Sequence, residues 1–345
     1  MFLKIIKSKI TITVSILALI FIIGWNWPSK AFEYDYGVTF SSKYARELGV
    51  DPKAVFDSMV NELGIKKVRL VAYWDEIEKV QGQYDFSDLD WQVERAEELG
   101  LDVILTVGRR VPRWPECHNP KWIQDKSWDE EKSELLVYMI EVVNRYKDSS
   151  AIKIWQVENE PFLTVYVPEI CGSELDKNLL DREIELVRQL DEQDRPILTT
   201  DSGNLGSWWG AYKRGDMFGS TFYVYLANET IGGFKTIVNH NFYKFKHLLM
   251  KIFHGDKPIY LIEVSMEPWL TESIPNTSIE DQLKFMNVDR LEKVIEMSAK
   301  TNFDEQYLWG VEWWYYLREN GHPEIWNYLD ERIFDGETKV EESQE

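Results

Sequence analysis

Two carboxyl side chains occupy positions in the sequence where chemistry is expected. Residues 151–157 form a short apolar run with several β-branched residues, and it leads directly into Asn159 and Glu160. Residues 257–262 form a second apolar run, which ends at Glu263. Each run predicts a buried strand, and an ionisable group at the end of such a strand is costly unless it is paired or used. Two carboxyl groups of this kind can act as general acid and nucleophile on a glycosidic bond.

Each motif also has a plain structural interpretation. The first could be a surface turn without a catalytic role, and Glu263 could be an ordinary carboxylate at a strand end. The apolar, tryptophan-containing strand before Glu160 favours the catalytic interpretation. Glu267 is a rival to Glu263, but it lies beyond the apolar run and ranks below it.

Strand-like and helix-like segments alternate from residue 36 onward, which is typical of a parallel sheet with crossover helices. Asp51 and Pro52 are expected to open one helix, Ser87 to cap another, and residues 278–300 to form a single long helix. Eight strand–helix units predict an α/β fold, a single-domain (β/α)8 TIM barrel. The strands are expected at residues 36–41, 67–72, 102–107, 151–157, 196–200, 217–223, 258–263 and 305–310. The interval between the fifth and sixth strands leaves room only for a short or irregular helix.

These motifs resemble those of the retaining glycoside hydrolases of clan A, which are cellulase-like TIM barrels. In that family an Asn-Glu pair follows the fourth strand and a Glu follows the seventh, as Asn159, Glu160 and Glu263 do here. The resemblance covers about residues 36–326. It implies that Glu160 is the acid/base and Glu263 the nucleophile in the cleavage of β-linked O-glycosidic bonds in oligo- or polysaccharides by double displacement.

The same resemblance implies roles for further residues. Asn159 matches the amide that binds the sugar 2-hydroxyl, and Arg69 matches the arginine that aligns the nucleophile, with a simple ion pair as the alternative for Arg69. A tyrosine hydroxyl is expected on Glu263, from Tyr223 or its rival Tyr225. An aromatic floor under the reacting sugar is expected from Trp309, with Trp313 as its competitor.

Other features after the strands are less specific. Trp74, Trp114, Trp208 and Trp209 are candidate sugar platforms, although packing is at least as good an explanation for each. Arg109 and Arg110 either read an acidic sugar or pair with some of the 59 acidic residues. Cys117 and Cys171 lie in loops after neighbouring strands of the predicted barrel. A disulfide and two free thiols are both open there, and export favours the disulfide.

Bulk composition limits the partners. The formal charge of −20 repels nucleic acid, so a neutral carbohydrate is the expected partner. Neither a metal nor a cofactor is expected, because no ligand cluster stands out, and this argues against a metal-dependent barrel hydrolase. The remaining alternative is a catalytically inactive, carbohydrate-binding TIM barrel, whose signature would be the loss of one acid. Both acids are present.

The chain is expected to divide into three parts. Residues 1–30 contain an uncharged apolar run, 10–25, after three lysines, which indicates a signal peptide or an uncleaved membrane anchor. The length of the run favours the anchor. Residues 31–329 are the predicted catalytic barrel, and 330–345 a polar, acidic tail. The barrel is therefore expected outside the cytoplasm, anchored to the cell membrane or secreted.

Overall fold

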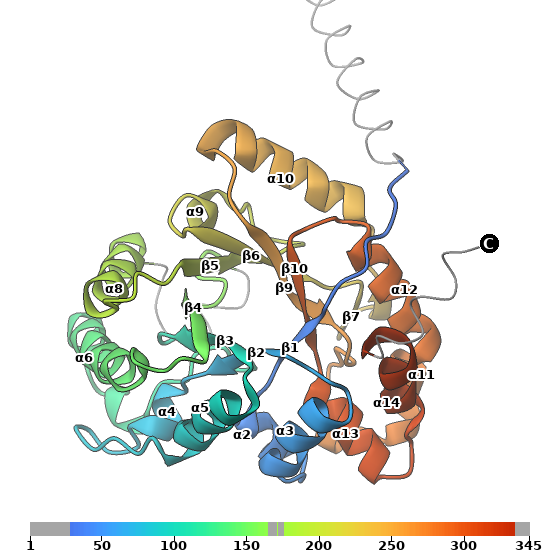
Figure 1. The fold of residues 1–345 in the computed structure, drawn as a ribbon, viewed down its shortest axis with the longest axis horizontal. Helices are drawn as coiled ribbons and strands as arrows, with labels where there is room; N and C mark the ends of the chain where they lie inside the picture. The colour runs from blue at the N-terminus through green and yellow to red at the C-terminus, as the bar shows by residue number, and fades with distance from the viewer. Residues whose placement is uncertain (1–27, 165–170, 172–175, 335–345) are drawn as a thin grey trace, which may run out of the picture.

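The computed structural model describes residues 28–164, 171 and 176–334. Its centre is a closed barrel of eight parallel strands with helices around the outside, as Figure 1 shows. The predicted barrel is therefore confirmed. Around the barrel the order is β1-β10-β9-β6-β5-β4-β3-β2. Its strands are β1 (Gly37–Thr39), β2 (Lys67–Val71), β3 (Asp102–Val107), β4 (Ile152–Val157), β5 (Ile197–Asp201), β6 (Met217–Phe222), β9 (Ile259–Ser265) and β10 (Glu305–Trp309).

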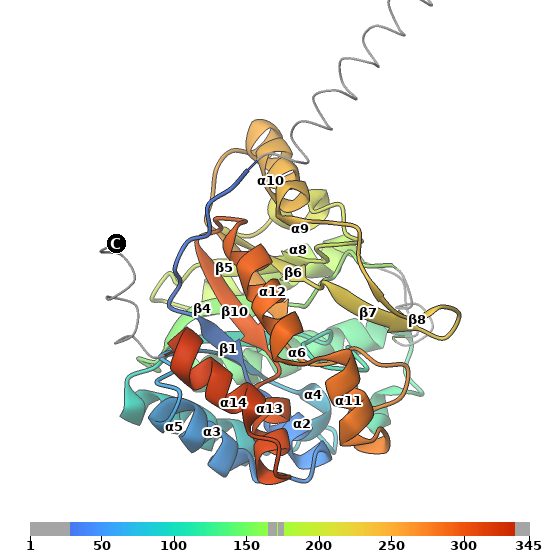
Figure 2. The ribbon, with the colours of Figure 1, turned by 90° about the vertical axis from the view of Figure 1, so that its right-hand side faces the viewer.

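Most of the helices lie on the outer wall, where they cover the strands (Figures 1 and 2). The longer ones are α3 (Pro52–Asn61), α5 (Ser87–Leu99), α6 (Trp128–Tyr146), α8 (Lys177–Leu190), α10 (His240–His254) and α12 (Val288–Ala299). The shorter ones are α2 (Ser42–Glu47), α4 (Trp74–Ile77), α9 (Trp209–Tyr212), α11 (Ile279–Phe285), α13 (Val311–Glu319) and α14 (Glu324–Leu329). Short α9 occupies the narrow interval between the fifth and sixth barrel strands, as expected.

Helix ends follow the capping residues, with two corrections. Asp51 caps α3 and accepts from the Lys53 N–H, as predicted. Ser87 does not cap α5; it is the first helical residue, and its N–H donates to the Asp85 carboxylate. The single helix expected over residues 278–300 is two helices, because Asn287 caps α12 with its own side chain and so starts a second helix.

A small hairpin, β7 (Tyr225–Asn228) and β8 (Gly232–Lys235), follows β6 and was not predicted. Its residues show little apolar alternation, and Tyr225 is the one buried residue among them. The hairpin lies outside the barrel, after the carboxyl end of β6 (Figure 2).

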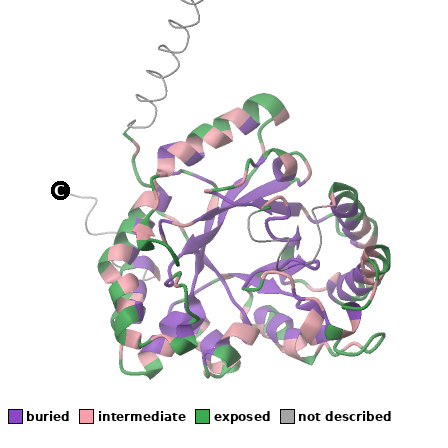
Figure 3. Cartoon of the chain, turned by 180° about the vertical axis from the view of Figure 1, so that it is seen from behind, coloured by how far each residue is buried: buried purple, intermediate pink, exposed green. Residues whose placement is uncertain are grey.

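The apolar core has two layers. A large layer fills the space between the strands and the helices. A smaller cluster fills the barrel itself, from Ile104, Ile154, Leu198, Met217, Tyr260, Ile262 and Tyr307. Figure 3 shows the strands as buried and the outward sides of the helices as exposed. The carboxyl end of the barrel interior is left to polar side chains.

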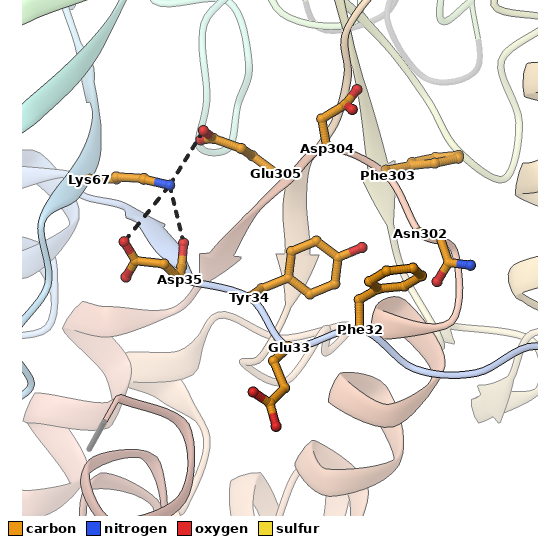
Figure 4. A pocket seen from close by; sticks show the side chains of 9 residues that line it. All are labelled: Phe32, Glu33, Tyr34, Asp35, Lys67, Asn302, Phe303, Asp304 and Glu305. Atoms are coloured by element: carbon orange, nitrogen blue, oxygen red, sulfur yellow. Dashed lines mark hydrogen bonds and ion pairs between the residues drawn. The ribbon is translucent and has the colours of Figure 1, made fainter. Parts of the chain in front are cut away.

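The amino end of the barrel carries a cavity of about 340 Å³. Figure 4 shows Lys67 there between Asp35 and Glu305, at 3.9 and 3.3 Å. These residues precede or begin strands, so the cavity lies at the opposite end from Glu160 and Glu263.

The two ends of the chain lie partly outside the described residues. The predicted apolar run 10–25 falls there, and none of the helices in residues 28–334 that the structure describes is long and apolar enough to cross a membrane. Residues 28–35 run along the outside of the barrel, mostly exposed, with the Phe32 N–H bonded to Ala299 O. At the other end a π-helical turn, Asp330–Phe334, buries Ile333, so the packed chain extends past residue 329.

Candidate active site

The turn after β4 presents Glu160 at the carboxyl end of the barrel. Glu158 and Glu160 have φ angles of 59° and 46°, which residues other than glycine rarely adopt. The N–H groups of Arg109 and Arg110 donate to the Glu158 carboxylate at 2.7 and 2.9 Å. The Glu160 N–H donates to Thr200 Oγ1 at 2.9 Å. Bonds from the two neighbouring strands therefore hold this unfavourable turn in place.

Glu263 lies near the carboxyl end of β9, and both of its oxygens accept hydrogen bonds. Arg69 Nη1 donates to Oε1 at 2.7 Å, and the Tyr223 hydroxyl donates to Oε2 at 2.9 Å. Arg69 is fully buried on β2, so its bond to β9 crosses the barrel interior. Burial, followed by the charge of Glu263, raises the pKa of Tyr223 well above its ordinary value, so the hydroxyl keeps its proton. Its predicted rival, Tyr225, lies on the hairpin under the guanidinium of Arg290.

The Asn159 side chain has one orientation. Its Oδ1 accepts from Arg69 Nη2 at 2.8 Å, Gln156 Nε2 at 3.2 Å and Thr200 Oγ1 at 3.2 Å. The Nδ2 group is then left to donate, and Glu116 Oε2 lies 3.4 Å from it. Because three donors fix the oxygen, the amide nitrogen is aimed at the site.

Glu160 is set up differently from Glu263. Thr221 Oγ1 donates to its Oε1 at 3.0 Å. Burial, then repulsion from Glu263 and Glu116, raises the pKa of Glu160 to about 8. Thr221 and Glu263 face each other across the β6–β9 ladder. The site thus holds one carboxyl group whose pKa is raised and a second that accepts a hydrogen bond from a guanidinium.

Glu116 is a third carboxyl group at this end, and the sequence did not reveal it. It follows β3 within a long irregular loop and is only partly exposed. Burial raises its pKa to about 7, Arg110 opposes this, and Glu263 adds to it. Its position immediately before Cys117, itself placed at the rim, was the one available signal.

The two arginines after β3 were predicted either to bind an acidic sugar or to pair with acidic residues, and their contacts differ. Arg109 Nη1 pairs with Glu131 at 2.8 Å, and its guanidinium lies over the Trp128 ring. Arg110 Nη1 donates to Leu163 O. Its Nε and Nη2 have no partner among the described residues, although the side chain is buried. Arg109 is therefore a pairing residue, while Arg110 keeps free donors near Glu116 and Glu160.

Trp309, at the end of β10, lies in a buried ion-pair cluster. Its Nε1 donates to Glu267 Oε1 at 2.7 Å, and the guanidinium of Arg113 covers one ring face at 4.1 Å. Arg113 also pairs with Glu267 and Glu312. Its competitor Trp313 is fully buried and donates to Gln282. Glu267 is thus part of the wall behind Trp309.

The four tryptophans predicted as sugar platforms differ in exposure and position. Trp74 and Trp208 are fully buried, so both were wrong as platforms: they pack in the core. Trp209 packs on Phe253 and His254 of α10, on the outer wall. Trp114, 65% exposed in the loop after β3, is the one of the four that remains open to a ligand at this end.

Cys117 and Cys171 form a disulfide, which joins the loop after β3 to the segment after β4. Arg109 Nη1 also donates to Cys171 O at 3.3 Å. The bridge therefore fastens the loop that carries Glu116 beside the turn that carries Glu160.

Comparisons with known proteins show a likeness in sequence and in fold. A family model described as glycosyl hydrolase 42, β-galactosidase, matches residues 55–178. The β-galactosidase BgaA of Clostridium cellulovorans is 28% identical over 120 residues, which are 30% of this chain and 18% of that protein. The matched stretch is therefore less than a fifth of that relative.

Solved structures of the same fold cover more of the chain. A GH5_18 protein from Bifidobacterium longum has a TM-score of 0.56 at 16% identity, over 81% of this chain and 69% of its own. Xylanase 10B from Thermotoga petrophila has a TM-score of 0.52 at 17% identity, over 80% and 81%. The resemblance to the clan A TIM-barrel glycosidases is confirmed.

Proposed function

We propose that the protein is a retaining glycoside hydrolase that cleaves β-linked O-glycosidic bonds in oligo- or polysaccharides. The observation that carries the proposal is that two carboxyl groups at one end of the barrel have different surroundings. Glu263 accepts from Arg69 and Tyr223, whereas Glu160 has a pKa of about 8 and is protonated at neutral pH. Double displacement needs one group in each state.

In the first step Glu263 attacks the anomeric carbon while the Glu160 proton passes to the leaving glycosidic oxygen. This step forms a covalent glycosyl ester and releases the aglycone alcohol. Glu160, now ionised, takes a proton from water, and the resulting hydroxide displaces Glu263 from the anomeric carbon. Both carboxyl groups return to their starting states, and two inversions retain the anomeric configuration.

Other side chains support these steps. The Asn159 amide nitrogen is aimed at the site and suits the sugar 2-hydroxyl, where a hydrogen bond strengthens as the ring flattens. Trp309 offers an aromatic surface under the reacting sugar. A structural neighbour, a GH5_18 variant from Bifidobacterium longum, is described in complex with Manβ1-4GlcNAc, which supports a β-linked substrate.

We expect Glu160→Ala and Glu263→Ala to fail in different ways. Glu160→Ala should lose activity on substrates with poor leaving groups, by about 10²–10⁴-fold, because protonation is lost. An activated aryl glycoside should still glycosylate Glu263, and azide should then restore turnover and give the β-glycosyl azide. Glu263→Ala should show no retaining turnover on any substrate, and azide should give only the opposite anomer.

The anomer is read by NMR, and Glu229→Ala, on the exposed hairpin turn, serves as the matched control. Wild-type activity in either active-site variant would overturn the assignment. A folded wild-type protein that binds oligosaccharides without cleaving any would instead show a carbohydrate-binding barrel.

We also propose that residues 1–30 anchor the enzyme, with the catalytic domain, residues 31–329, outside the cytoplasm. The uncharged run 10–25 behind three lysines supports this orientation. Full-length protein should sediment with membranes. A mature chain beginning near Phe32 in the medium would show a cleaved signal instead.

A further inference from the structure

Helix α10 is apolar on the side that faces away from the barrel. Tyr243 and Met250 are buried against the barrel. Leu248 and Ile252, one turn apart, are 52% and 65% exposed. A helix that is apolar on both sides is normally covered on both.

The exposed apolar surface extends beyond these two residues. Phe253, at the end of α10, is 61% exposed and packs at a tilt on Trp209 of α9, itself 44% exposed. Ile237, just before the helix, is 89% exposed. Figure 3 shows exposed residues along α10. We call Ile237, Leu248, Ile252, Phe253 and Trp209 the α10 face.

The charge of α10 is opposite to that of the chain. Its fifteen residues include Lys244, Lys246 and Lys251 and no Asp or Glu, although the whole chain has 59 acidic residues and a charge of −20. Lys246 bonds inward to Gly203 O and Gly206 O. Lys244 and Lys251 lie beside the apolar stripe, where Lys251 also pairs with Asp256 at 2.7 Å, just past the helix end. A local basic helix on an acidic protein is suited to a negatively charged surface.

The described chain begins beside this helix. The Lys244 ammonium donates to Ser29 Oγ at 3.0 Å, and both views show the first described segment running past α10 (Figures 1 and 2). The uncharged run 10–25 ends only a few residues before Ser29. A chain anchored through that run therefore has α10 as its part nearest to the bilayer.

We propose that the α10 face lies on the surface of an anionic phospholipid bilayer and fixes the orientation of the barrel. Apolar side chains of an interfacial helix enter the boundary between headgroups and acyl chains, and flanking lysines bind the phosphates. The inference goes beyond glycoside hydrolysis and rests on the proposed anchor. Its physical consequence is that the barrel wall, not a flexible tether, sets how the site faces the surroundings.

The test places a polarity-sensitive fluorophore at Leu248→Cys in the full-length protein, bound to vesicles of phosphatidylcholine and phosphatidylglycerol. Cys117 and Cys171 are paired, so the new thiol is the one that reacts. Val137→Cys on α6 is the control, since Val137 is similarly exposed, at 45%, on another wall. Ile252→Cys is a second reporter if the first variant folds poorly.

We expect the label at 248 to shift to the blue, to be quenched by nitroxide-bearing lipids and to be shielded from iodide. The label at 137 should behave in the opposite way. Vesicles without phosphatidylglycerol, or the double variant Lys244→Glu/Lys251→Glu, should weaken lipid quenching at 248.

Three results would overturn the proposal. Protein that floats with the vesicles while both labels stay open to iodide keeps its anchor but has no docked α10 face. A label shielded from iodide yet out of reach of the lipid nitroxides is covered by protein, either its own amino-terminal segment or a second copy. Protein that does not float with the vesicles has neither the anchor nor the docked face.

Discussion

The most informative single residue is Glu116, because it acts on the proton of Glu160 through charge. Burial raises the pKa of Glu160 most, the charges of Glu263 and then Glu116 raise it further, and Arg110 and Thr221 lower it. Catalysis needs Glu160 protonated, so activity should fall as pH rises through about 8. The alkaline limb of the pH profile thus measures the surroundings of Glu160.

Glu116→Gln should move that alkaline limb of kcat/KM to lower pH. The substitution removes a negative charge near Glu160, so the pKa of Glu160 falls and Glu160 loses its proton at a lower pH. Glu229→Gln is the matched control. An alkaline limb that stays at the wild-type pH would mean that Glu116 does not act on Glu160.

Arg69→Lys should lose most of the activity and some of the stability. Lysine retains the positive charge but not the planar guanidinium that bonds Gln156, Asn159 and Glu263 at once. We expect kcat to fall by about 10²-fold or more. The melting temperature should fall as well, because one ammonium cannot replace all the buried bonds of the guanidinium. Wild-type kcat in this variant would show that charge alone, without the fork, is sufficient.

At the scale of elements, the strands were predictable and the loops were not. All eight barrel strands lie within two residues of the ranges expected at each end, because each is a short apolar run bounded by a break in pattern. The same reasoning placed Glu160 and Glu263 together, since strand ends meet in a barrel, whereas Arg69, Asn159 and Tyr223 were expected there from the family resemblance. Glu116 was missed because nothing in local periodicity says which residue of a long loop turns inward.

The errors have physical causes as well. Trp74 and Trp208 follow strands, as platform residues would, but both pack inward at the start of a short helix. Trp74 is the first residue of α4, and Trp208 is the N-cap of α9. The break at Met286 and Asn287 was hidden because both flanking helices continue a similar apolar pattern. The hairpin after β6 has too little alternation to be recognised.

The disulfide between Cys117 and Cys171 predicts the number of free thiols and the stability of the loop after β3. Denatured but unreduced protein from an oxidising compartment should titrate with no free thiols, because the chain's two cysteines are paired. Cys171→Ser should free Cys117 and loosen the loop that carries Glu116, which lowers both melting temperature and activity. Two free thiols in the wild-type protein would exclude the bridge.

For the whole molecule, buried carboxyl groups determine how stability depends on pH. Burial raises the pKa of Glu116 and Glu312 to about 7 and that of Glu160 to about 8. Groups of this kind stabilise the fold below their unfolded pKa, and that stability is lost as pH rises through the folded value. Carboxylates with lowered pKa values, such as Asp176 and Asp216, act in the opposite sense at acid pH.

The free energy of unfolding should therefore be greatest near about pH 5 and should decline toward about pH 8. Urea unfolding across this range measures it, and Glu160→Gln should flatten the decline by removing one of the groups that titrate. Constant or increasing stability from the acid to the alkaline end would contradict this account.

The bonds of Arg69 have a consequence for anyone who wishes to make a sturdier version of this protein. One guanidinium braces β2 against β4 and β9, and two of the groups it holds are themselves part of the reactive site. Replacing the polar side chains at the carboxyl end of the barrel interior with apolar ones stabilises many protein cores. Here it would remove the site together with the bonds of Arg69. Gains should instead be sought on the outer shell, in helix caps and surface charges, where a change leaves the braced centre untouched.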